Sequence, residues 1–335
     1  MSIDFLYDKK NIDYVSGHIF KGKSYRCSYI RYKTLYKNPA PGTENVEFYL
    51  YKPKEEVRAS TLILHGLGSR NIKFLLWLGP HLANAGVNTS ILILPGNYTR
   101  VENNSVSGKS YLYPDMKSMF QFWEHGVVDT LTTIDLLEQS HCWKDNNIIL
   151  GYCLGGMIST IVGAIESRLN HLLFMTTGGH IPRILHQSPA AAFARKLFDR
   201  GLEPDFYLDD REKLYNIYDE QFPLVREMTF ADIVSSKEIH PLFKIDPISY
   251  AHLLDMKKVT FIDAYFDSTL PIQSRKVLYD EMYGANRKVL PISHVNWLPF
   301  GYFVAKYILH KLNINAKEAK KALLTKESIE NPLEK

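Results

Sequence analysis

The chain has 335 residues, of which 45% are hydrophobic and 23% are charged, which is within the normal range for a globular protein with a sizeable core. Its formal net charge of +4 is small for this length and its Lys and Arg residues are scattered, so nucleic acid is not an expected partner. No segment approaches the roughly 18 uncharged apolar residues that cross a bilayer, and no signal peptide is recognisable, so we expect a cytoplasmic protein without a membrane span.

The sequence contains no recognisable motif for binding a metal or an organic cofactor. The three cysteines, Cys27, Cys142 and Cys153, are too few for a disulfide framework and none falls in a CxxC metal pattern. We therefore expect neither a metal nor an organic cofactor.

The predicted elements begin with two strands and continue as an alternation of strands and helices. Residues 24–34 (SYRCSYIRYKT) and 45–53 (NVEFYLYKP) alternate aromatic and polar residues, which is typical of antiparallel strands. Short apolar runs then follow at 60–66, 89–96, 147–151, 171–179, 259–267 and 287–293. Stretches of helical length occupy 71–86, 116–140, 153–168, 271–284 and 295–312. This pattern predicts an α/β protein whose mainly parallel central sheet carries helices on both faces.

Residues 178–255 interrupt the alternation, because they have helical spacing and many charges but no buried-strand run. We predict a helical cap or lid there, which divides the core into residues 1–177 and 256–312, and a polar C-terminal helix or tail over 313–335. The aromatic residues of the predicted lid suit either an apolar acyl or aromatic group or ordinary core packing; they are Phe193, Phe198, Phe206, Tyr207, Tyr215 and Tyr218.

The segment GYCLGG, residues 151–156, follows a predicted strand and precedes a predicted helix. This is the glycine-nucleophile-glycine elbow with cysteine where serine is usual. The glycines allow a turn so tight that Cys153 is exposed above the sheet, at a helix N-terminus that favours a thiolate. The alternative is that Cys153 is only a small buried residue in a sharp turn.

Two later residues complete a candidate triad. Asp267 and His294 follow the predicted strands at 259–267 and 287–293, so the chain order is nucleophile, acid, base. Taken singly, Asp267 could be a helix cap near Pro271 and His294 an ordinary loop residue. Asp263, inside the strand, is the weaker candidate for the acid.

The segment LILHGLG ends the strand at 60–66 with a His65-Gly66 turn. Such a turn lets the backbone N–H of Leu67 face the reacting carbonyl together with the N–H of Leu154, so these two groups are the candidate oxyanion hole. His65 and Gly66 are also candidates for the substrate pocket, as is Tyr152. The ring of His65 is expected to hold the loop rather than to act as a base.

With these motifs the sequence resembles the esterase/lipase-like α/β-hydrolases over about residues 45–312, and GYCLGG is similar to the cysteine elbow of dienelactone hydrolases and polyhydroxyalkanoate synthases. The segment at 94–116, LPGNYTRVENNSVSGKSYLYPDM, resembles the part of bacterial esterase-like relatives that carries an Arg, a Ser-Gly and an Asp before the helix that precedes the elbow. The resemblance implies that four residues shape the pocket wall; they are Arg100, Ser107, Gly108 and Asp115. The alternative for them is a polar loop with a helix cap at Asp115.

The sequence also departs from each of these relatives. Dienelactone hydrolases lack an insertion as large as 178–255, the esterase-like relatives carry serine at the elbow, and polyhydroxyalkanoate synthases have an additional N-terminal region. The resemblance therefore implies the fold and the triad and leaves the substrate open.

The expected activity is hydrolysis of a carboxylic ester, lactone or thioester on a small-molecule acyl substrate, through an acyl-Cys153 intermediate. His294, oriented by Asp267, would take the thiol proton. The alternatives are an acyltransferase with the same triad and a non-catalytic binding protein. The oligomeric state is open, with a homodimer as one option.

Overall fold

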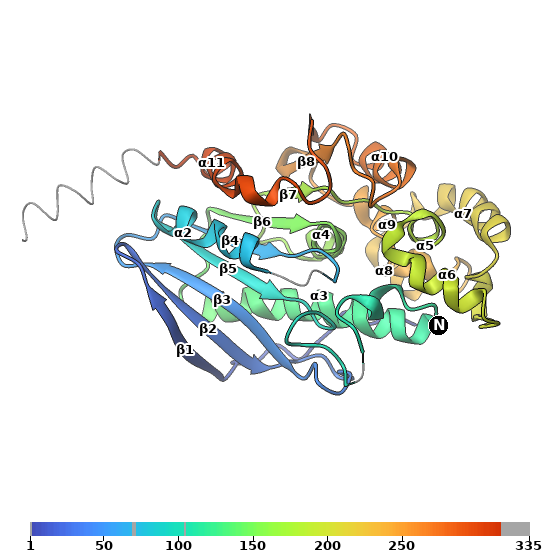
Figure 1. Cartoon of the computed structure of the whole chain (residues 1–335), viewed down its shortest axis with the longest axis horizontal. Helices are drawn as coiled ribbons and strands as arrows, with labels where there is room; N and C mark the ends of the chain where they lie inside the picture. The colour runs from blue at the N-terminus through green and yellow to red at the C-terminus, as the bar shows by residue number, and fades with distance from the viewer. Residues whose placement is uncertain (1, 69–71, 104, 316–335) are drawn as a thin grey trace, which may run out of the picture.

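A computed structural model describes residues 2–68, 72–103 and 105–315. Its centre is a nine-stranded sheet in the order β1-β2-β3-β5-β4-β6-β7-β8-β9 (Figure 1). The first three strands and the β3/β5 pair are antiparallel, and every pair from β5 to β9 is parallel. The strands are β1 (Tyr14–Lys21), β2 (Tyr25–Lys33), β3 (Asn45–Pro53), β4 (Ala59–Leu64), β5 (Val87–Ile93), β6 (Asn147–Tyr152), β7 (Leu172–Met175), β8 (Val259–Ala264) and β9 (Asn286–Leu290).

Helices cover both faces of the sheet. The central strands are fully buried, and their side chains alternate between two hydrophobic clusters: in β4, Leu62 and Leu64 belong to one cluster and Ile63 to the other. The first cluster packs against α3 and α4, and the second against α2 and α11, so the sheet is the middle of three layers (Figure 1). The helices are α1 (Lys73–Leu76), α2 (Leu78–Ala83), α3 (Met116–Gln139), α4 (Leu154–Ile165), α5 (Ile181–Gln187), α6 (Ala192–Phe198), α7 (Arg211–Val225), α8 (Phe230–Ser235), α9 (Ile248–Ala251), α10 (Ile272–Glu281) and α11 (Gly301–Lys311).

The predicted fold class is confirmed, with differences at the ends of elements. The stretch predicted as one helix over 71–86 forms α1 and α2 on either side of Trp77, and the helix predicted over 295–312 begins at Gly301. The strand β1 was not predicted, because all of its residues are exposed and it shows no buried face. The tail predicted over 313–335 lies almost wholly outside the described residues.

The segment between β7 and β8 contains α5 to α9 and, within the described residues, no strand. These helices gather beside the carboxyl ends of the parallel strands (Figure 1). Their buried side chains belong to the same cluster as those of α3 and α4. A buried carboxylate, Asp246, accepts hydrogen bonds from the N–H groups of His180 and Ile181 at the start of α5 and from the hydroxyl of Tyr218 in α7.

In the part of the chain that the structure describes, no helix is both long enough and apolar enough to cross a membrane.

Candidate active site

Cys153 lies in the turn between β6, which ends at Tyr152, and α4, which begins at Leu154. Its backbone has φ 51° and ψ −114°, a conformation that L-residues rarely adopt. The Cys153 carbonyl accepts a hydrogen bond of 2.7 Å from the hydroxyl of Thr177, and its N–H donates to the Met175 carbonyl at 3.0 Å. The turn is thus held by β7 on one side.

The glycines of the elbow are required by close backbone contacts. A Cβ at Gly151 would collide with the backbone of Gly155 and Gly156, and a Cβ at Gly155 would collide with the carbonyl of Leu64 in β4. A Cβ at Gly156 would lie 2.6 Å from the side chain of Thr177. These contacts hold α4 tightly on the sheet and fix the turn at Cys153, whose side chain is buried at 7% exposure rather than exposed as expected.

The structure brings His294 and Asp267 together at 2.7 Å between Nδ1 and Oδ2. The Asp267 side chain is fully buried, and its Oδ1 accepts hydrogen bonds from the N–H groups of Thr269 and Leu270. The hydroxyl of Tyr152 donates to the His294 carbonyl at 3.0 Å, and the two rings are 5.4 Å apart. His294 is therefore held by the acid on one side and by the residue before the elbow cysteine on the other.

The electrostatics of this pair favour a charged imidazole. Burial opposes the charged ring of His294, but the Cys153 thiolate and hydrogen bonds to Asp267 and Cys153 outweigh burial and raise the pKa of His294 to about 10. Burial likewise opposes ionisation of Asp267, and the hydrogen bond and charge of His294 hold the pKa of Asp267 below its usual value. His294 can thus hold a proton taken from the Cys153 thiol.

Two backbone donors are available at the same place. Leu67 follows β4 and Leu154 follows the elbow cysteine, and both line the pocket at Cys153. Neither N–H donates a hydrogen bond to another described residue. The loop that carries Leu67 is close to the elbow, because a Cβ at Gly66 would lie 2.8 Å from the Tyr152 ring and 3.1 Å from Cys153 Cβ.

His65 is fully buried beneath this loop. Its Nδ1 lies 2.7 Å from the Gly66 carbonyl, and its Nε2 accepts a hydrogen bond of 3.0 Å from the N–H of Leu94. Burial lowers the pKa of His65 to about 4, so the ring is neutral at pH 7. Its hydrogen bonds join the ends of β4 and β5, and it does not line the pocket.

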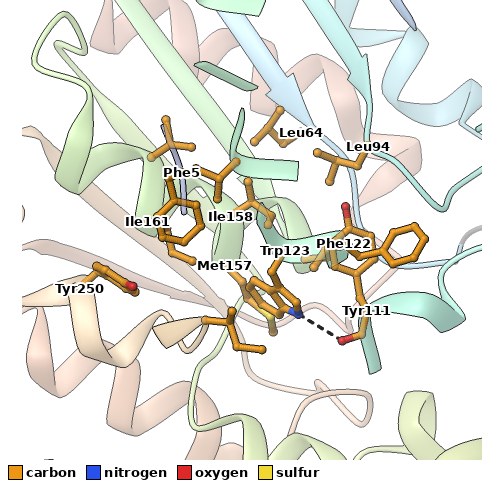
Figure 2. Close-up of a cluster of buried hydrophobic side chains, with 14 of the residues drawn as sticks. Phe5, Leu64, Leu94, Tyr111, Phe122, Trp123, Met157, Ile158, Ile161 and Tyr250 are labelled. Atoms are coloured by element: carbon orange, nitrogen blue, oxygen red, sulfur yellow. Dashed lines mark hydrogen bonds between the residues drawn. The ribbon is translucent and has the colours of Figure 1, made fainter. Parts of the chain in front are cut away.

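The pocket at Cys153 has a volume of about 260 Å³. Trp123 of α3 and Met157 of α4 line its inner part, and both belong to the buried cluster beneath the sheet (Figure 2). The indole N–H of Trp123 donates to the Tyr111 carbonyl at 3.1 Å, so this ring is fixed (Figure 2). Among the described lining residues His294 alone is able to carry a positive charge, and none is a carboxylate.

Solved structures share this architecture. An acetyl xylan esterase from Paenibacillus sp. R4 matches with a TM-score of 0.60 and 15% identity, over 89% of this chain and 89% of that one. An S-formylglutathione hydrolase from Agrobacterium tumefaciens matches with a TM-score of 0.56 and 12% identity, over 88% and 99% of the two chains. The acetyl xylan esterase 1 of Thermoanaerobacterium sp. JW/SL YS485 matches with a TM-score of 0.53 and 16% identity, over 90% and 89%.

The chain has the α/β-hydrolase fold. No protein-family model matches the sequence, and no curated protein sequence matches it. Within the α/β-hydrolase fold, the elbow follows β6 and the candidate acid and base follow β8 and β9.

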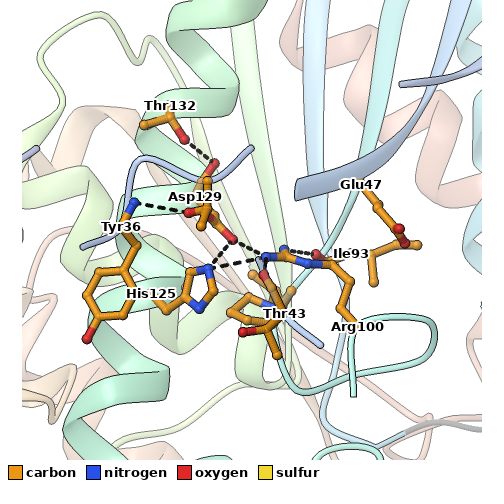
Figure 3. Close-up of polar contacts among 12 residues, drawn as sticks. Tyr36, Thr43, Glu47, Ile93, Arg100, His125, Asp129 and Thr132 are labelled. Carbon is orange, nitrogen blue, oxygen red and sulfur yellow. Dashed lines mark hydrogen bonds and ion pairs between the residues drawn. The ribbon is translucent and has the colours of Figure 1, made fainter. Parts of the chain in front are cut away.

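Arg100, expected in the pocket wall, instead points into the core of the α/β-hydrolase fold and is almost completely buried. Its guanidinium pairs with Asp129 of α3 at 2.6 Å and donates to the carbonyls of Ile93 and Thr43 at 2.7 and 2.9 Å (Figure 3). Figure 3 also shows His125 beside the pair, 3.1 Å from Asp129. The expectation was wrong because these buried acceptors, which lie far apart in the sequence, draw the guanidinium away from the pocket.

The other residues expected in the wall lie around it rather than in it. The hydroxyl of Ser107 accepts a hydrogen bond from the N–H of Tyr98, and Gly108 packs so closely on Gly68 that a Cβ there would collide with its backbone. Asp115 is the N-cap of α3 and accepts from the N–H of Ser118, which is the alternative considered above. Ser107 and Gly108 thus support the loop that carries Leu67.

Asp263, the weaker candidate for the acid, faces away from the site. Its carboxylate is buried and pairs with Arg275 and, at 3.0 Å, with Arg287.

None of the aromatic residues singled out in the predicted lid lines the Cys153 pocket; Tyr218, for example, is buried and stacks on Phe243 with ring centres 4.0 Å apart. From this segment Ile184 and Ala190 are the residues that reach the pocket wall in the described structure.

Asn97 is a supporting residue that the sequence analysis missed. It is fully buried, its Oδ1 accepts the N–H of Gly68 at 3.0 Å, and its Nδ2 donates to the Pro95 carbonyl. It therefore anchors the Leu67 loop to the end of β5. The available signal was its position directly after the Pro95-Gly96 turn.

Proposed function

We propose that this chain is a hydrolase that cleaves a carboxylic ester, lactone or thioester through an acyl-Cys153 intermediate. The observation that carries the proposal is that Cys153 and His294 line one pocket, while Asp267 contacts His294 at 2.7 Å. The structural neighbours named as esterases and as a hydrolase support the same class of reaction.

In the acylation step His294 takes the thiol proton and the Cys153 sulfur attacks the carbonyl carbon of the substrate. The carbonyl oxygen becomes an oxyanion, which in this proposal the N–H groups of the pocket residues Leu67 and Leu154 stabilise. The bond from carbon to the leaving oxygen or sulfur then breaks, and the leaving group takes the proton from His294. Asp267 holds the ring and stabilises its positive charge.

In the deacylation step His294 takes a proton from water as the water oxygen attacks the acyl-Cys153 carbonyl. The carbon–sulfur bond breaks, the acid product leaves, and the Cys153 thiolate and the His294 imidazolium are restored. The sum is the substrate plus water giving an acid and an alcohol or thiol.

The pocket supports an uncharged, apolar acyl group. Its described lining includes Trp123, Met157, Leu154 and Leu270, and no carboxylate or fixed cation that would pair with a charged acyl chain. Removing a charged group from water into such a pocket without a partner is unfavourable.

The same pocket favours one alternative, an acyltransferase. Cys153 and His294 are both buried, at 7% and 6% exposure, so an acceptor that fills the pocket could exclude water from the thioester. The acceptor would then replace water in the second step, with the same triad.

The test is turnover of p-nitrophenyl butyrate and of a butyryl thioester by wild type and by Cys153→Ala, His294→Gln and Asp267→Asn. We expect Cys153→Ala to fall to the uncatalysed rate and His294→Gln to lose on the order of 10³-fold in kcat. Adding alcohols or amines and measuring the acylated products separates transfer from hydrolysis.

Cys142→Ala is the matched control, because Cys142 is a buried free cysteine outside the pocket. Circular dichroism shows whether each variant is folded. Turnover that survives in folded Cys153→Ala would refute the nucleophile, and the absence of turnover with every ester and thioester would favour a non-catalytic binding protein.

A further inference from the structure

A second cavity, which we call the basic groove, adjoins the pocket at Cys153. It measures about 670 Å³. It lies between the loop at 102–113 and α6, and its described lining includes three cations and three aromatic rings: Lys109, Lys196, Arg200, Tyr113, Phe122 and Phe193.

The α6 side of the basic groove is one face of the helix. Phe193, Lys196 and Leu197 are spaced i, i+3 and i+4 in α6, so their side chains project in one direction, and Arg200 in the turn after α6 lines the groove beside them. Across the groove, the Lys109 ammonium lies 5.4 Å from the centre of the Phe193 ring. Lys109 thus joins Lys196 of α6 and Arg200 of the turn that follows it.

The positive charge of the basic groove is not neutralised by the protein. Among the described residues, Lys109, Lys196 and Arg200 form no ion pair, and all three are exposed to solvent. Glu102 is the one carboxylate of the described lining, and it accepts a hydrogen bond of 3.0 Å from the hydroxyl of Ser110. A groove with three cations and one engaged carboxylate attracts anions.

Neighbouring residues of the same elements line the two cavities. In the loop, Ser110 and Tyr113 face the groove while Tyr111 and Leu112 face the pocket. In α3, Phe122 lines the groove and Trp123 lines the pocket; near the start of α6, Phe193 lines the groove and Ala190 lines the pocket. The groove and the pocket therefore lie next to each other along the same three stretches of the chain.

We propose that the basic groove binds the phosphorylated leaving group of an acyl thioester whose acyl chain occupies the Cys153 pocket. This rests on the proposed function, and it names the substrate class: an apolar acyl group joined through sulfur to an extended thiol that carries phosphates. The cations pair with the phosphates, and Tyr113, which is exposed, offers a ring face on which a ring of the leaving group stacks. In acylation the Cys153 sulfur adds to the carbonyl carbon, the carbon–sulfur bond of the substrate then breaks, and the leaving thiolate takes the proton from His294.

The kinetic test compares butyryl-coenzyme A with butyryl-N-acetylcysteamine, which has the same acyl group and thioester but no phosphate. We expect Lys196→Glu/Arg200→Glu to raise KM for butyryl-coenzyme A on the order of tenfold, with kcat and the kinetics of the short thioester unchanged. In wild type, raising the ionic strength should raise KM for butyryl-coenzyme A alone.

The matched control is Arg26→Glu/Lys52→Glu, which changes the net charge equally at exposed positions on β2 and β3, away from both cavities. It should leave KM for both thioesters unchanged. Lys196→Gln/Arg200→Gln provides a second groove variant, for which a smaller rise in KM for butyryl-coenzyme A is expected.

A binding measurement separates this proposal from the proposed function. Calorimetric titration of folded Cys153→Ala with coenzyme A, 3′,5′-ADP and pantetheine tests the groove without any turnover. We expect binding of the two phosphorylated compounds, weakened by Lys196→Glu/Arg200→Glu, and none of pantetheine. Equal binding of coenzyme A and pantetheine, no binding of coenzyme A, or equal KM changes for both thioesters would overturn the proposal, whether or not Cys153 is the nucleophile.

Discussion

Cys153 combines a strained backbone with a position beside a charged partner. Its φ of 51° and ψ of −114° are maintained by the tight contacts of the elbow glycines and by the hydrogen bond from Thr177. Strained residues persist where the surrounding structure holds them, and they cluster at functional sites. The same residue forms a hydrogen bond with His294, as the proposed acylation step requires.

Replacing Cys153 with Ala should lower the pKa of His294. The thiolate charge and hydrogen bond help to raise that pKa to about 10, whereas burial acts in the opposite direction and would remain in the variant. The measurement is a pH titration of the His294 ring by NMR in wild type and in Cys153→Ala. An unchanged pKa would show that Cys153 carries no charge beside the ring.

Arg100→Met should destabilise the protein by about 3–5 kcal/mol, because it leaves the carboxylate of Asp129 buried without its partner. The side chain of Arg100 is 1% exposed and that of Asp129 is fully buried. Arg200→Met is the control, since Arg200 is exposed and forms no ion pair among the described residues. Urea unfolding measures both, and a loss equal to that of the control would contradict a structural role for the pair.

At the scale of elements, every candidate group of the site follows the carboxyl end of a parallel strand. Leu67 follows β4, Cys153 follows β6, Asp267 follows β8 and His294 follows β9. Parallel strands end on one edge of the sheet, so residues that lie more than a hundred positions apart meet there. The position of α4 against the sheet then decides where the sulfur stands.

Gly155→Ala should displace the elbow and reduce both stability and turnover. The added methyl group collides with the Leu64 carbonyl, and overpacking of this kind costs about 1–3 kcal/mol. Gly17→Ala is the matched control in β1, where the nearest atom to an added Cβ is 3.9 Å away. Urea unfolding and ester turnover are measured for both; equal effects would show that the packing of α4 on β4 does not set the elbow.

The sequence predicts the elements that repeat a local rule and misses what depends on distant partners. The elbow was predictable from the strand, the glycines and the helix, and the positions of Asp267 and His294 followed from strand ends. Arg100 was not, because its direction is set by acceptors at Thr43, Ile93 and Asp129. The break of the predicted 71–86 helix at Trp77 did have a signal, the Gly79-Pro80 pair, because Pro80 has no N–H to donate to the carbonyl four residues before it.

In the whole molecule, the sheet separates two hydrophobic clusters, and the segment between β7 and β8 belongs to one of them. Phe243 and Tyr250 of that segment share the first cluster with Trp123 of α3 and Ile158 of α4. A segment that shares a core with the sheet is not expected to unfold by itself. The division of the chain into a core and a cap at residues 178–255 therefore stays a prediction.

The shared core predicts that residues 178–255 unfold together with the rest of the protein. All four Trp residues lie outside that segment, so Trp fluorescence reports on the core, and hydrogen exchange of the α7 amides reports on the segment. Both should give the same midpoint in a urea series. Loss of protection in α7 at a clearly lower urea concentration would show that the segment is an independent cap.

The central claim is that Cys153 becomes acylated, and peptide mapping by mass spectrometry tests it most directly. Wild-type protein is mixed with p-nitrophenyl butyrate at pH 7, quenched with acid within one turnover and digested for peptide mapping. We predict one butyryl group on the peptide that contains Cys153, its decay as the acid product forms, and no adduct in Cys153→Ala. Steady turnover with no acyl group on Cys153 at any quench time, or with the acyl group on another residue, would contradict the account.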